Sequence, residues 1–289
     1  MAASAPVALL GDFSKLEGDE KARALAKARQ RLAKIEEEVY ITEERYAAML
    51  KSVADLLREG RERREEKPSR TSSLPNPQET KQIFSNIEDI YALSELFLED
   101  LRYNRALRLV IGDCEKYAKN EEDEENAAKA EKARMVIVRD NPIAKEVMRV
   151  MVMGFGDRGE SDTLTDIILS YLVCPASLAE IFDKFIPSFR IYIPYVTNYF
   201  QDIPNKLLQN PNRRIRALKE KFKDGTPLQS ILVCPASRIP RYKLMLTELS
   251  KYTLESPEEK VKITRVIEKI DKLARHVNDE VKRCSDQRR

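Results

Sequence analysis

The sequence predicts an all-α protein, an elongated bundle of about six or more long helices with a charged insertion. Glycine is scarce: it accounts for 8 of 289 residues, where an average chain of this length carries about 20. Turns depend on glycine and proline, yet both are absent from 19–59, 78–111, 113–141 and 258–289. Sandwiches, barrels and doubly wound sheets need many short connections, so these stretches favour long helices.

The first predicted element is a helix over residues 19–59. Its nonpolar positions recur at three- and four-residue steps, which places them on one helical face. They are Leu32, Ile35, Val39, Thr42, Tyr46, Met49, Leu50, Val53, Leu56 and Leu57. We expect residues 1–24 to be a flexible lead, with the helical pattern starting near residue 19. Gly60 and the charged run 61–67 are expected to end this helix, and residues 68–77 to form a loop.

A second helical stretch follows, with the same spacing of apolar residues. Its stripe comprises Ile83, Phe84, Ile87, Ile90, Leu93, Leu96, Phe97 and Leu101. Residues 119–133 are so rich in Glu, Lys and Asn that they cannot be core, and we expect a solvated helix or a disordered charged insert there.

The C-terminal part predicts further helices. Residues 178–200 place aromatic side chains at helical spacing, and Pro187 and Pro194 within this run predict kinks or a break. The remaining segments are a connector, a basic stretch and two helices, at 204–211, 212–223, 228–253 and 258–285. The apolar set of the last helix is Val261, Ile263, Val266, Ile267, Ile270, Leu273 and Val277.

Composition excludes several functions. The net charge of +3, from 51 basic and 48 acidic residues, gives no electrostatic case for nucleic-acid binding. A single histidine, His276, excludes most His-based catalytic triads and multi-histidine metal sites. The cysteines form no C-x-x-C pair, so free thiols in a reducing cytosol are favoured over disulfides or zinc. No apolar run is long enough to span a membrane, and the first residues lack a basic secretory signal, so we expect a cytoplasmic protein.

Two motifs leave alternatives open. Gly154, Gly156 and Gly159 fit G-x-G-x-x-G between a possible strand and a possible helix, the pattern of a dinucleotide-binding enzyme. No second strand–helix–strand unit accompanies it, which favours a glycine-broken turn in an insert. The segment Leu-Val-Cys-Pro-Ala-Ser occurs at 172–177 and at 232–237, each time with a proline expected to open a helix. Either a local duplication or coincidence explains this repeat.

Four ordered blocks carry a family resemblance. The first, E-x-x-x-T-E-x-x-Y, runs from Glu38 to Tyr46, and the next, I-F-x-N-I-x-x-I, from Ile83 to Ile90. The third, I-F-x-K-F-x-P-x-F, occupies 181–189, and the fourth, L-x-x-P-x-x-R-x-x-[KR]-Y-x-L-x-L-x-E-L, occupies 232–249. The chain therefore resembles the Dbl-homology (DH) domain of Rho-family guanine nucleotide exchange factors, over roughly 25–103 and 178–285.

The resemblance implies a function without covalent chemistry. A DH domain stimulates GDP release from a Rho-family small GTPase by remodelling its switch regions and Mg²⁺ site, and thereby takes part in actin cytoskeleton regulation. It binds the nucleotide-free or GDP-bound GTPase and needs no cofactor or metal of its own. We accordingly expect a DH domain over residues 25–289, with an insertion at about 104–177 and no pleckstrin-homology domain within the chain. Peripheral membrane recruitment would come through other regions.

The resemblance also implies the GTPase-binding residues. Glu38 would contact switch I, and Arg241 and Asn278 would meet switch II and the segment beside it. Gly225 and Thr226 fall where family members carry residues that help choose the GTPase. The matching blocks add Thr42, Glu43, Ser237 and Arg238 to the expected contact set. By contrast, we expect four neighbouring residues to pack in the interior: Tyr46, Tyr242, Leu244 and Leu246.

Two departures from the family pattern keep a second function open. The family usually carries Lys-Pro-x-Gln-Arg in the last block, whereas here Cys234 replaces the lysine and Ser237 the glutamine. The alternative to an active exchange factor is therefore an exchange-inactive helical scaffold that binds a GTPase or another helical partner.

Overall fold

The structure, a computed structural model, describes residues 18–66, 74–118, 176–201, 208–209, 213–222 and 225–286. Across these ranges the chain forms helices joined by turns and contains no strand. The predicted all-α class is therefore confirmed. None of the described helices is long and apolar enough to cross a membrane.

The described helices fall into two units. They are α1 (Gly18–Glu66), α2 (Pro77–Phe84), α3 (Ile87–Ala118), α7 (Leu178–Phe185), the 3-10 helix η3 (Ser188–Ile191), α8 (Tyr192–Phe200), α10 (Arg213–Glu220), α11 (Leu228–Tyr252) and α12 (Pro257–Asp286). The first unit comprises residues 1–95 and 178–289, and the second comprises residues 96–177. The boundary falls within α3, so only the first part of that helix belongs to the first unit.

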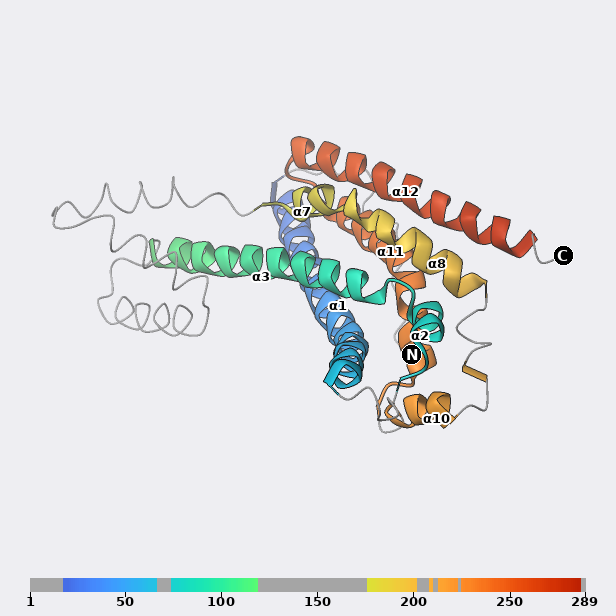
Figure 1. The fold of residues 1–289 in the computed structure, drawn as a ribbon. Coiled ribbons are helices and arrows are strands. Elements are labelled where there is room, and N and C mark those ends of the chain that lie inside the picture. Colours follow the sequence, from blue (N-terminus) through green and yellow to red (C-terminus); the bar gives the residue numbers. More distant parts are fainter. Residues whose placement is uncertain are drawn as a thin grey trace, which may run out of the picture. The chain divides into compact units, whose positions relative to one another are not determined.

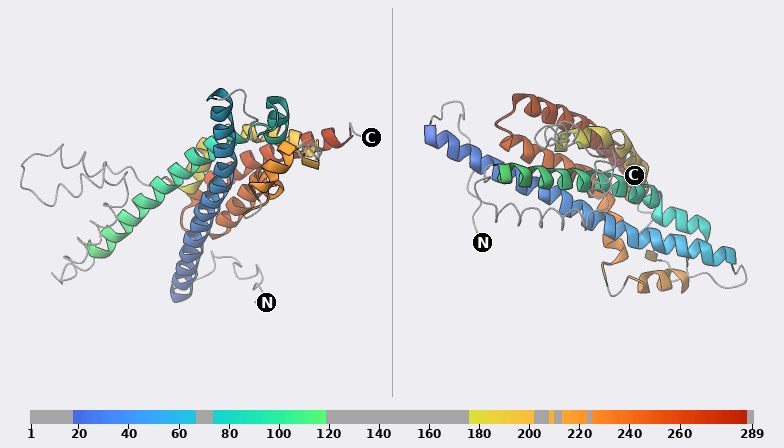
Figure 2. Two further views of the ribbon diagram at one scale, coloured as in Figure 1. Left: turned by 60° about the horizontal axis from the view of Figure 1, so that its bottom comes forward. Right: turned by 90° about the vertical axis from the view of Figure 1, so that its left-hand side faces the viewer.

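The helix α11 is central to the first unit. It packs against α1, α8 and α12, and α12 in turn packs against α7 and α8. The views in Figure 2 show α11 beside α1 from two further directions. Because neighbouring helices cover three sides of α11, one side of this helix remains exposed to solvent.

The first helix is longer than the sequence predicts at both ends. It starts at Gly18, inside the expected flexible lead, and runs through Gly60 to Glu66. The expectation that Gly60 ends it is wrong, because this glycine serves a packing contact instead. A Cβ atom on Gly60 would lie 2.0 Å from Cδ1 of Leu74, which is itself only 2% exposed. Glycine here lets the chain after α1 return close against the helix.

Replacing Gly60 with valine is expected to lower the free energy of unfolding by about 1–3 kcal/mol, because overpacking forces neighbours out of place. The matched control is Gly225→Val, since no atom lies within 4 Å of a Cβ built on Gly225. We expect the control to change stability by less than about 0.5 kcal/mol. Urea unfolding measures both; equal losses for the two variants would contradict the packing role of Gly60.

A break at Ser85 divides the second helical stretch of the sequence into α2 and α3. Ser85 has a positive φ of 50° with a ψ of −125°, which departs from helical geometry and ends α2. Asn86 then donates a 2.8 Å hydrogen bond from Nδ2 to the carbonyl of Ile191. The stripe predicted for this stretch is buried except at Leu96, which is 56% exposed. The asparagine of the I-F-x-N-I block, directly before α3, therefore links the start of that helix to the last residue of η3.

The predicted break in the aromatic run is confirmed. The helix α7 ends before Pro187, and the short η3 leads into α8, where Pro194 lies in the first turn and costs no hydrogen bond. Aromatic rings fill the space between these helices and α11. Phe189 stacks on Tyr242 at 5.1 Å between centroids, and Phe182 meets Tyr242 edge to face at 5.3 Å. These contacts fix α7 and η3 against α11.

The second copy of the repeat does not open a helix. Pro235 lies inside α11, as does Pro240, so the expectation for this proline is wrong. Each proline removes one N–H from the backbone ladder of the helix. Side chains bind carbonyls in the same stretch: the Tyr195 hydroxyl donates to Leu232 O at 2.8 Å, and the Cys234 thiol to Ser230 O at 3.0 Å.

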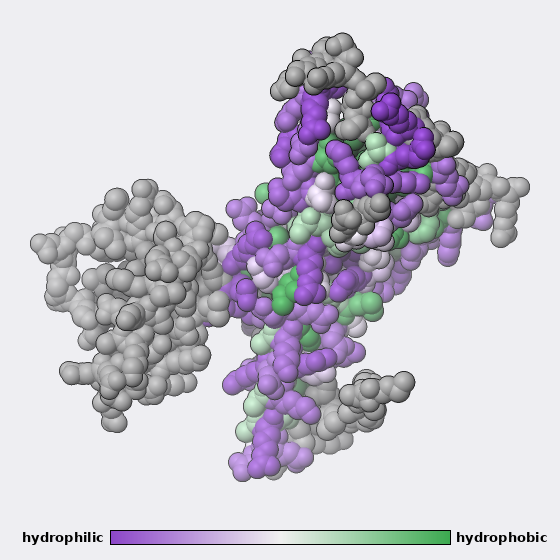
Figure 3. Space-filling view, turned by 90° about the horizontal axis from the view of Figure 1, so that it is seen from below, coloured by the Kyte–Doolittle hydropathy of each residue, from purple (hydrophilic) through white to green (hydrophobic). Residues whose placement is uncertain are grey.

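The last helix buries most of its predicted apolar set, with two departures. Val261 is 69% exposed, and Ile267 is only partly buried. Charged residues make up 34% of the sequence, and the surface in Figure 3 is accordingly mostly hydrophilic with small hydrophobic patches. Among the described residues, the large exposed apolar side chains are Leu96, Tyr103, Phe200, Val233, Leu244 and Val261.

In the second unit the structure describes the later part of α3 and residues 176–177. Arg108 donates from Nη2 to the carbonyl of Ala176 at 3.3 Å. The charged segment 119–133 and the glycine motif at 154–159 lie outside the described residues, as does most of the expected insertion. The proposed insertion boundaries and the dinucleotide alternative stay predictions.

Candidate functional site

The helices α1 and α11 run antiparallel, and side-chain contacts fix their register. Arg29 pairs with Glu255 at 2.7 Å, and the guanidinium of Arg31 lies 5.8 Å from the ring centroid of Tyr252. Further along α1, Glu43 contacts Arg238. Residue numbers therefore increase along α1 in the direction in which they decrease along α11. Following the register between these contacts, Thr42 lies at about the level of Arg241.

The helices α11 and α12 are also antiparallel, joined by the turn after Tyr252. Lys243 of α11 forms an ion pair with Asp271 of α12, and Asp271 also pairs with Arg275. The hydrogen bond from Lys243 lowers the pKa of Asp271. Asn278 follows Asp271 by two helical turns on the same stripe, so the antiparallel register places it at about the level of Ser237.

These registers place the predicted contact residues at similar levels along the surface of the bundle. Glu38, Ser237, Arg241 and Asn278 are exposed and Thr42 is half-buried. With a rise of about 1.5 Å per residue, they fall within about 12 Å along the α11 axis. We call this surface the three-helix face, defined by Glu38 and Thr42 of α1, Ser237 and Arg241 of α11, and Asn278 of α12.

The exposed side of α11 runs along the middle of this face. Val233, Ser237, Arg241 and Leu244 follow one another at steps of four, four and three residues, which is one helical stripe. Leu244 is 68% exposed, so the expectation that it packs in the interior is wrong. The spacing from Ser237 and Arg241 is the signal that could have placed it on the surface. The expected burial of Tyr46, Tyr242 and Leu246 is confirmed.

A groove adjoins the three-helix face at the N-terminal end of α11. Its volume is about 650 Å³, and Gly225 and Thr226 line it opposite Met49, Ser52 and Leu56 of α1, among other residues. Met49, Ser52 and Leu56 follow Thr42 at steps of seven, three and four residues and so continue the stripe of Glu38 and Thr42. The structure thus places Gly225 and Thr226 beside the face rather than on it.

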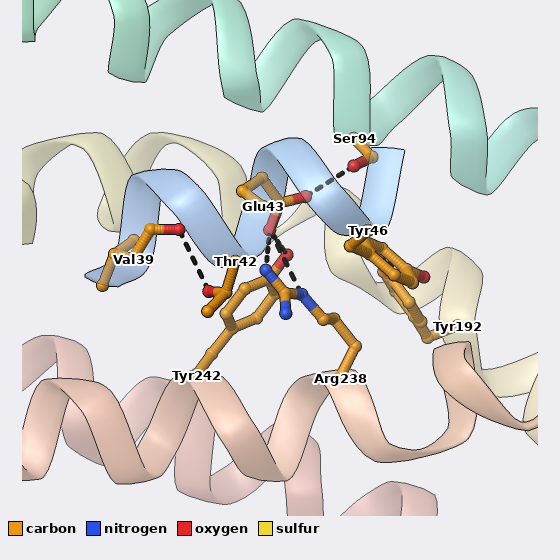
Figure 4. A network of polar contacts seen from close by, with 8 residues as sticks. All are labelled: Val39, Thr42, Glu43, Tyr46, Ser94, Tyr192, Arg238 and Tyr242. Atoms are coloured by element: carbon orange, nitrogen blue, oxygen red, sulfur yellow. Dashed lines mark hydrogen bonds and ion pairs between the residues drawn. The ribbon is translucent and has the colours of Figure 1, made fainter. Parts of the chain in front are cut away.

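Two expected contact residues lie inside the bundle. Glu43 is 0% exposed and Arg238 3%, and Figure 4 shows them at the centre of a polar network. Nε of Arg238 donates to Oε2 of Glu43 at 3.1 Å, and Nη2 donates to the same oxygen. Side chains this deeply buried offer a partner no surface. The structure therefore corrects the expectation of direct contact for Glu43 and Arg238.

The network joins four helices. The carboxylate of Glu43 also accepts from Ser94 of α3 at 2.5 Å and from the Tyr242 hydroxyl at 2.7 Å. The guanidinium of Arg238 lies 4.7 Å from the ring centroids of both Tyr46 and Tyr242. Tyr46 in turn donates to Tyr192 of α8 at 3.2 Å. The aromatic spacing of residues 178–200 includes Tyr192 but does not link it to Tyr46, and no pattern in the sequence pointed to Ser94.

Charge within the network is compensated. Burial by itself would lower the pKa of Arg238, but Tyr242 and Glu43 raise it, so the guanidinium remains charged. Burial raises the pKa of Cys234, so the thiol on the edge of the face stays protonated at neutral pH. Across the described residues no three His, Cys, Asp or Glu side chains gather as a metal site. The chemistry available at the face is hydrogen bonding, charge and apolar contact.

The buried tyrosines predict a loss of stability at alkaline pH. Burial raises the pKa of Tyr46, Tyr192, Tyr195 and Tyr242 above the ordinary value, which is about 10 in unfolded chains. Above that pH the unfolded chain gives up protons that the folded chain keeps, so the free energy of unfolding falls as pH rises.

Absorbance at 295 nm during a pH titration, followed together with helicity, checks this prediction. These four phenols should ionise only as the helices unfold. Their ionisation in a chain that stays helical would contradict it.

The sequence of these helices matches a known domain family. The sequence model of the RhoGEF domain matches residues 35–278, which include every residue of the three-helix face. The chain belongs to the RhoGEF domain family. Its predicted identity as a DH domain of exchange factors is thereby confirmed.

Curated relatives of this RhoGEF domain are much longer proteins. Rac guanine nucleotide exchange factor JJ of Dictyostelium discoideum is 33% identical over 111 residues, 37% of this chain and 10% of the relative. Rho guanine nucleotide exchange factor 5 of Mus musculus is 33% identical over 122 residues, 40% of this chain and 8% of the relative. The chain therefore spans about a tenth or less of the length of either relative.

Solved structures share the fold of this RhoGEF domain. A structure of autoinhibited Vav1 matches with a TM-score of 0.55 and 18% identity, over 90% of this chain and 35% of that one. The complex of the PDZ-RhoGEF DH/PH domains with GTP-gamma-S activated RhoA matches with a TM-score of 0.52 and 14% identity, over 95% and 60% of the two chains. At these identities the likeness establishes the helical fold.

Proposed function

We propose that this RhoGEF domain accelerates GDP release from a Rho-family small GTPase. The three-helix face carries the proposal. It presents a carboxylate, a guanidinium and a carboxamide, from Glu38, Arg241 and Asn278, on the outer sides of three helices held in fixed register. One relative is named as a Rho exchange factor and another as a Rac exchange factor, which supports the choice of GTPase family.

The proposed mechanism is preferential binding. An exchange factor makes no covalent bond; it binds the nucleotide-free GTPase more tightly than the loaded one, and this difference in affinity weakens nucleotide binding reciprocally. A rigid face suits this task, because it keeps its shape while the switch regions and the Mg²⁺ site of the GTPase adapt to it. Glu38 would accept hydrogen bonds from switch I, and Arg241 and Asn278 would meet switch II. Glu43 and Arg238 do not contact the GTPase in this mechanism.

The test is a nucleotide-release assay on a panel of Rho-family GTPases loaded with fluorescent GDP, with a Ras-family GTPase for comparison. The folded 289-residue chain should accelerate release from at least one Rho-family member. Failure to accelerate any Rho-family member, or equal acceleration of the Ras-family protein, would overturn the proposal. A cytoplasmic location stays a prediction that the assay does not address.

An exchange-inactive scaffold remains the second candidate, and one observation favours it. At the two positions where the chain departs from the family pattern, the side chains turn back onto α11. The Cys234 thiol binds the carbonyl of Ser230, and the Ser237 hydroxyl donates to the carbonyl of Cys234 at 3.0 Å. Stable binding of a nucleotide-free GTPase without faster GDP release from any panel member would select the scaffold.

Replacing Leu244 with aspartate is expected to weaken GTPase binding by tenfold or more. Leu244 is an exposed apolar side chain on the outer stripe of α11, and if GTPase binding buries it, the lost apolar contact and the charge buried in its place cost about 1.5–3 kcal/mol or more. The control is Val261→Asp, an equally exposed apolar residue at the far end of α12. Calorimetry with the nucleotide-free GTPase measures both. Equal affinities for the two variants would exclude Leu244 from the interface.

A further inference from the structure

We propose that Glu43, Arg238 and Tyr242 form a register lock. The lock fixes the position of α11 along α1 and thereby positions the three-helix face. These are positioning residues, since they lie beneath the surface and act through their neighbours. The link to exchange rests on the proposed function, whereas the lock itself is a property of this chain alone.

The lock occupies positions that the packing pattern would otherwise give to apolar residues. On α1 the buried stripe runs through Val39, Glu43, Tyr46 and Leu50, and on α11 the buried residues around Arg238 are equally apolar. Stripes of uniform apolar side chains pack nearly as well after a shift of one helical turn. A single buried polar pair at such positions specifies register, as an a-position asparagine does in a coiled coil.

A shift of one turn would be costly here. It would move Arg238 about 5.4 Å along α1 and leave a buried guanidinium and a buried carboxylate without each other. Breaking a buried ion pair costs about 3–5 kcal/mol, and the hydroxyl of Tyr242, which moves with α11, would lose its acceptor on Glu43 as well. The guanidinium of Arg238, 4.7 Å from the ring centroid of Tyr46, adds a second constraint, because this ring belongs to α1 and the contact would be lost in the shift. The lock therefore disfavours the shifted packings that apolar contacts alone would permit.

The lock lies directly beneath the three-helix face. Glu43 follows Thr42 on α1, and Arg238 follows Ser237 and precedes Arg241 by three residues on α11. Any displacement of α11 would therefore change the spacing between the α1 and α11 parts of the face. Misplacing a contact group by about 1 Å costs a catalyst as much as about 100-fold in rate. The lock thus controls activity without touching the partner.

The decisive variant removes the lock without leaving a buried charge: Glu43→Met, Arg238→Met and Tyr242→Phe in one chain. Replacing a buried ion pair by apolar residues of similar size is often neutral or stabilising, so we expect the triple variant to stay helical. Spin labels carried by non-natural amino acids at Glu44 and Thr247, exposed positions off the face, report the α1–α11 distance in the full chain.

The wild-type chain should give one narrow distance distribution, and the triple variant a broader one or one shifted by about 5 Å. The maximal GDP-release rate at saturating chain concentration should fall at least tenfold. A helical triple variant with the wild-type distance distribution would overturn the lock. If the wild-type chain gave one narrow distance distribution and the triple variant a changed one, but no GTPase showed exchange, only the proposed function would be refuted.

A second variant keeps the test decisive if the triple variant does not fold. Arg238→Lys keeps the buried cation but removes the planar fork, so Glu43 remains compensated while the geometry loosens. We expect a broadened label distance and a several-fold slower maximal rate. A wild-type distance distribution in Arg238→Lys, together with a wild-type rate, would also overturn the proposal.

Discussion

Replacing Glu38 with alanine is expected to reduce the rate of GDP release at least thirtyfold while leaving helicity unchanged. Glu38 is exposed on α1 and forms part of the three-helix face. Removing one partner of a charged hydrogen bond that becomes buried on binding costs about 2–5 kcal/mol, and each 1.4 kcal/mol is about a factor of ten. The measurement is release of fluorescent GDP from the most responsive GTPase, with circular dichroism on the same samples.

The matched control is Glu44→Ala. Glu44 is also an exposed acid of α1, but it lies off the stripe that Glu38 and Thr42 occupy, and its hydrogen bond with Tyr40 is exposed. The control should exchange nucleotide at nearly the wild-type rate. If Glu38→Ala and Glu44→Ala had equal rates, α1 would contribute only general negative charge, and the specific role of Glu38 would be refuted.

Replacing Arg238 with methionine is expected to have the largest effect on stability of any single change considered. Methionine fills much of the space but leaves the carboxylate of Glu43 buried without its cation, which costs about 3–5 kcal/mol. The matched control is Arg241→Met, one helical turn further on, where the side chain is exposed and substitution should change stability by less than about 0.5 kcal/mol. Urea unfolding at neutral pH measures both.

The two arginine variants are expected to have opposite effects on binding and folding. Arg241→Met should fold normally but lose nucleotide-exchange activity, whereas Arg238→Met should lose stability. Similar unfolding midpoints for the two variants would mean that water or another group compensates Glu43, and the network would then not hold α1 against α11.

The helices and their buried faces could be predicted from sequence because both depend on local spacing. The sequence placed both bounds of α11 and α12 and the start of α1 within about one residue of those observed. The end of α1 could not be placed as well. Gly60 looks like a terminator in sequence, but its role is to admit Leu74, a contact that only the folded chain brings about.

The site was predicted in part, and the errors share a physical cause. Matching blocks identify residues that a family keeps, but a residue is kept for packing as well as for contact. Glu43 and Arg238 lie in the matching blocks, and in the folded chain they bind each other, 195 positions apart in sequence. Leu244 was misassigned for the converse reason, since an apolar residue in a helix is ordinarily buried. The register of α1 against α11 distinguishes these cases, and no local pattern contains it.

The two prolines inside α11 have a consequence for motion. They deprive the carbonyls of Ile231 and Ala236 of their helical partners, and Arg238 lies between Pro235 and Pro240. The amide protons around Arg238 should therefore exchange with solvent at a rate governed by contacts with α1 and α8 rather than by the helix's own ladder. This stretch owes its stiffness to its neighbours, so a partner bound across α1 and α11 would slow that exchange in both helices at once.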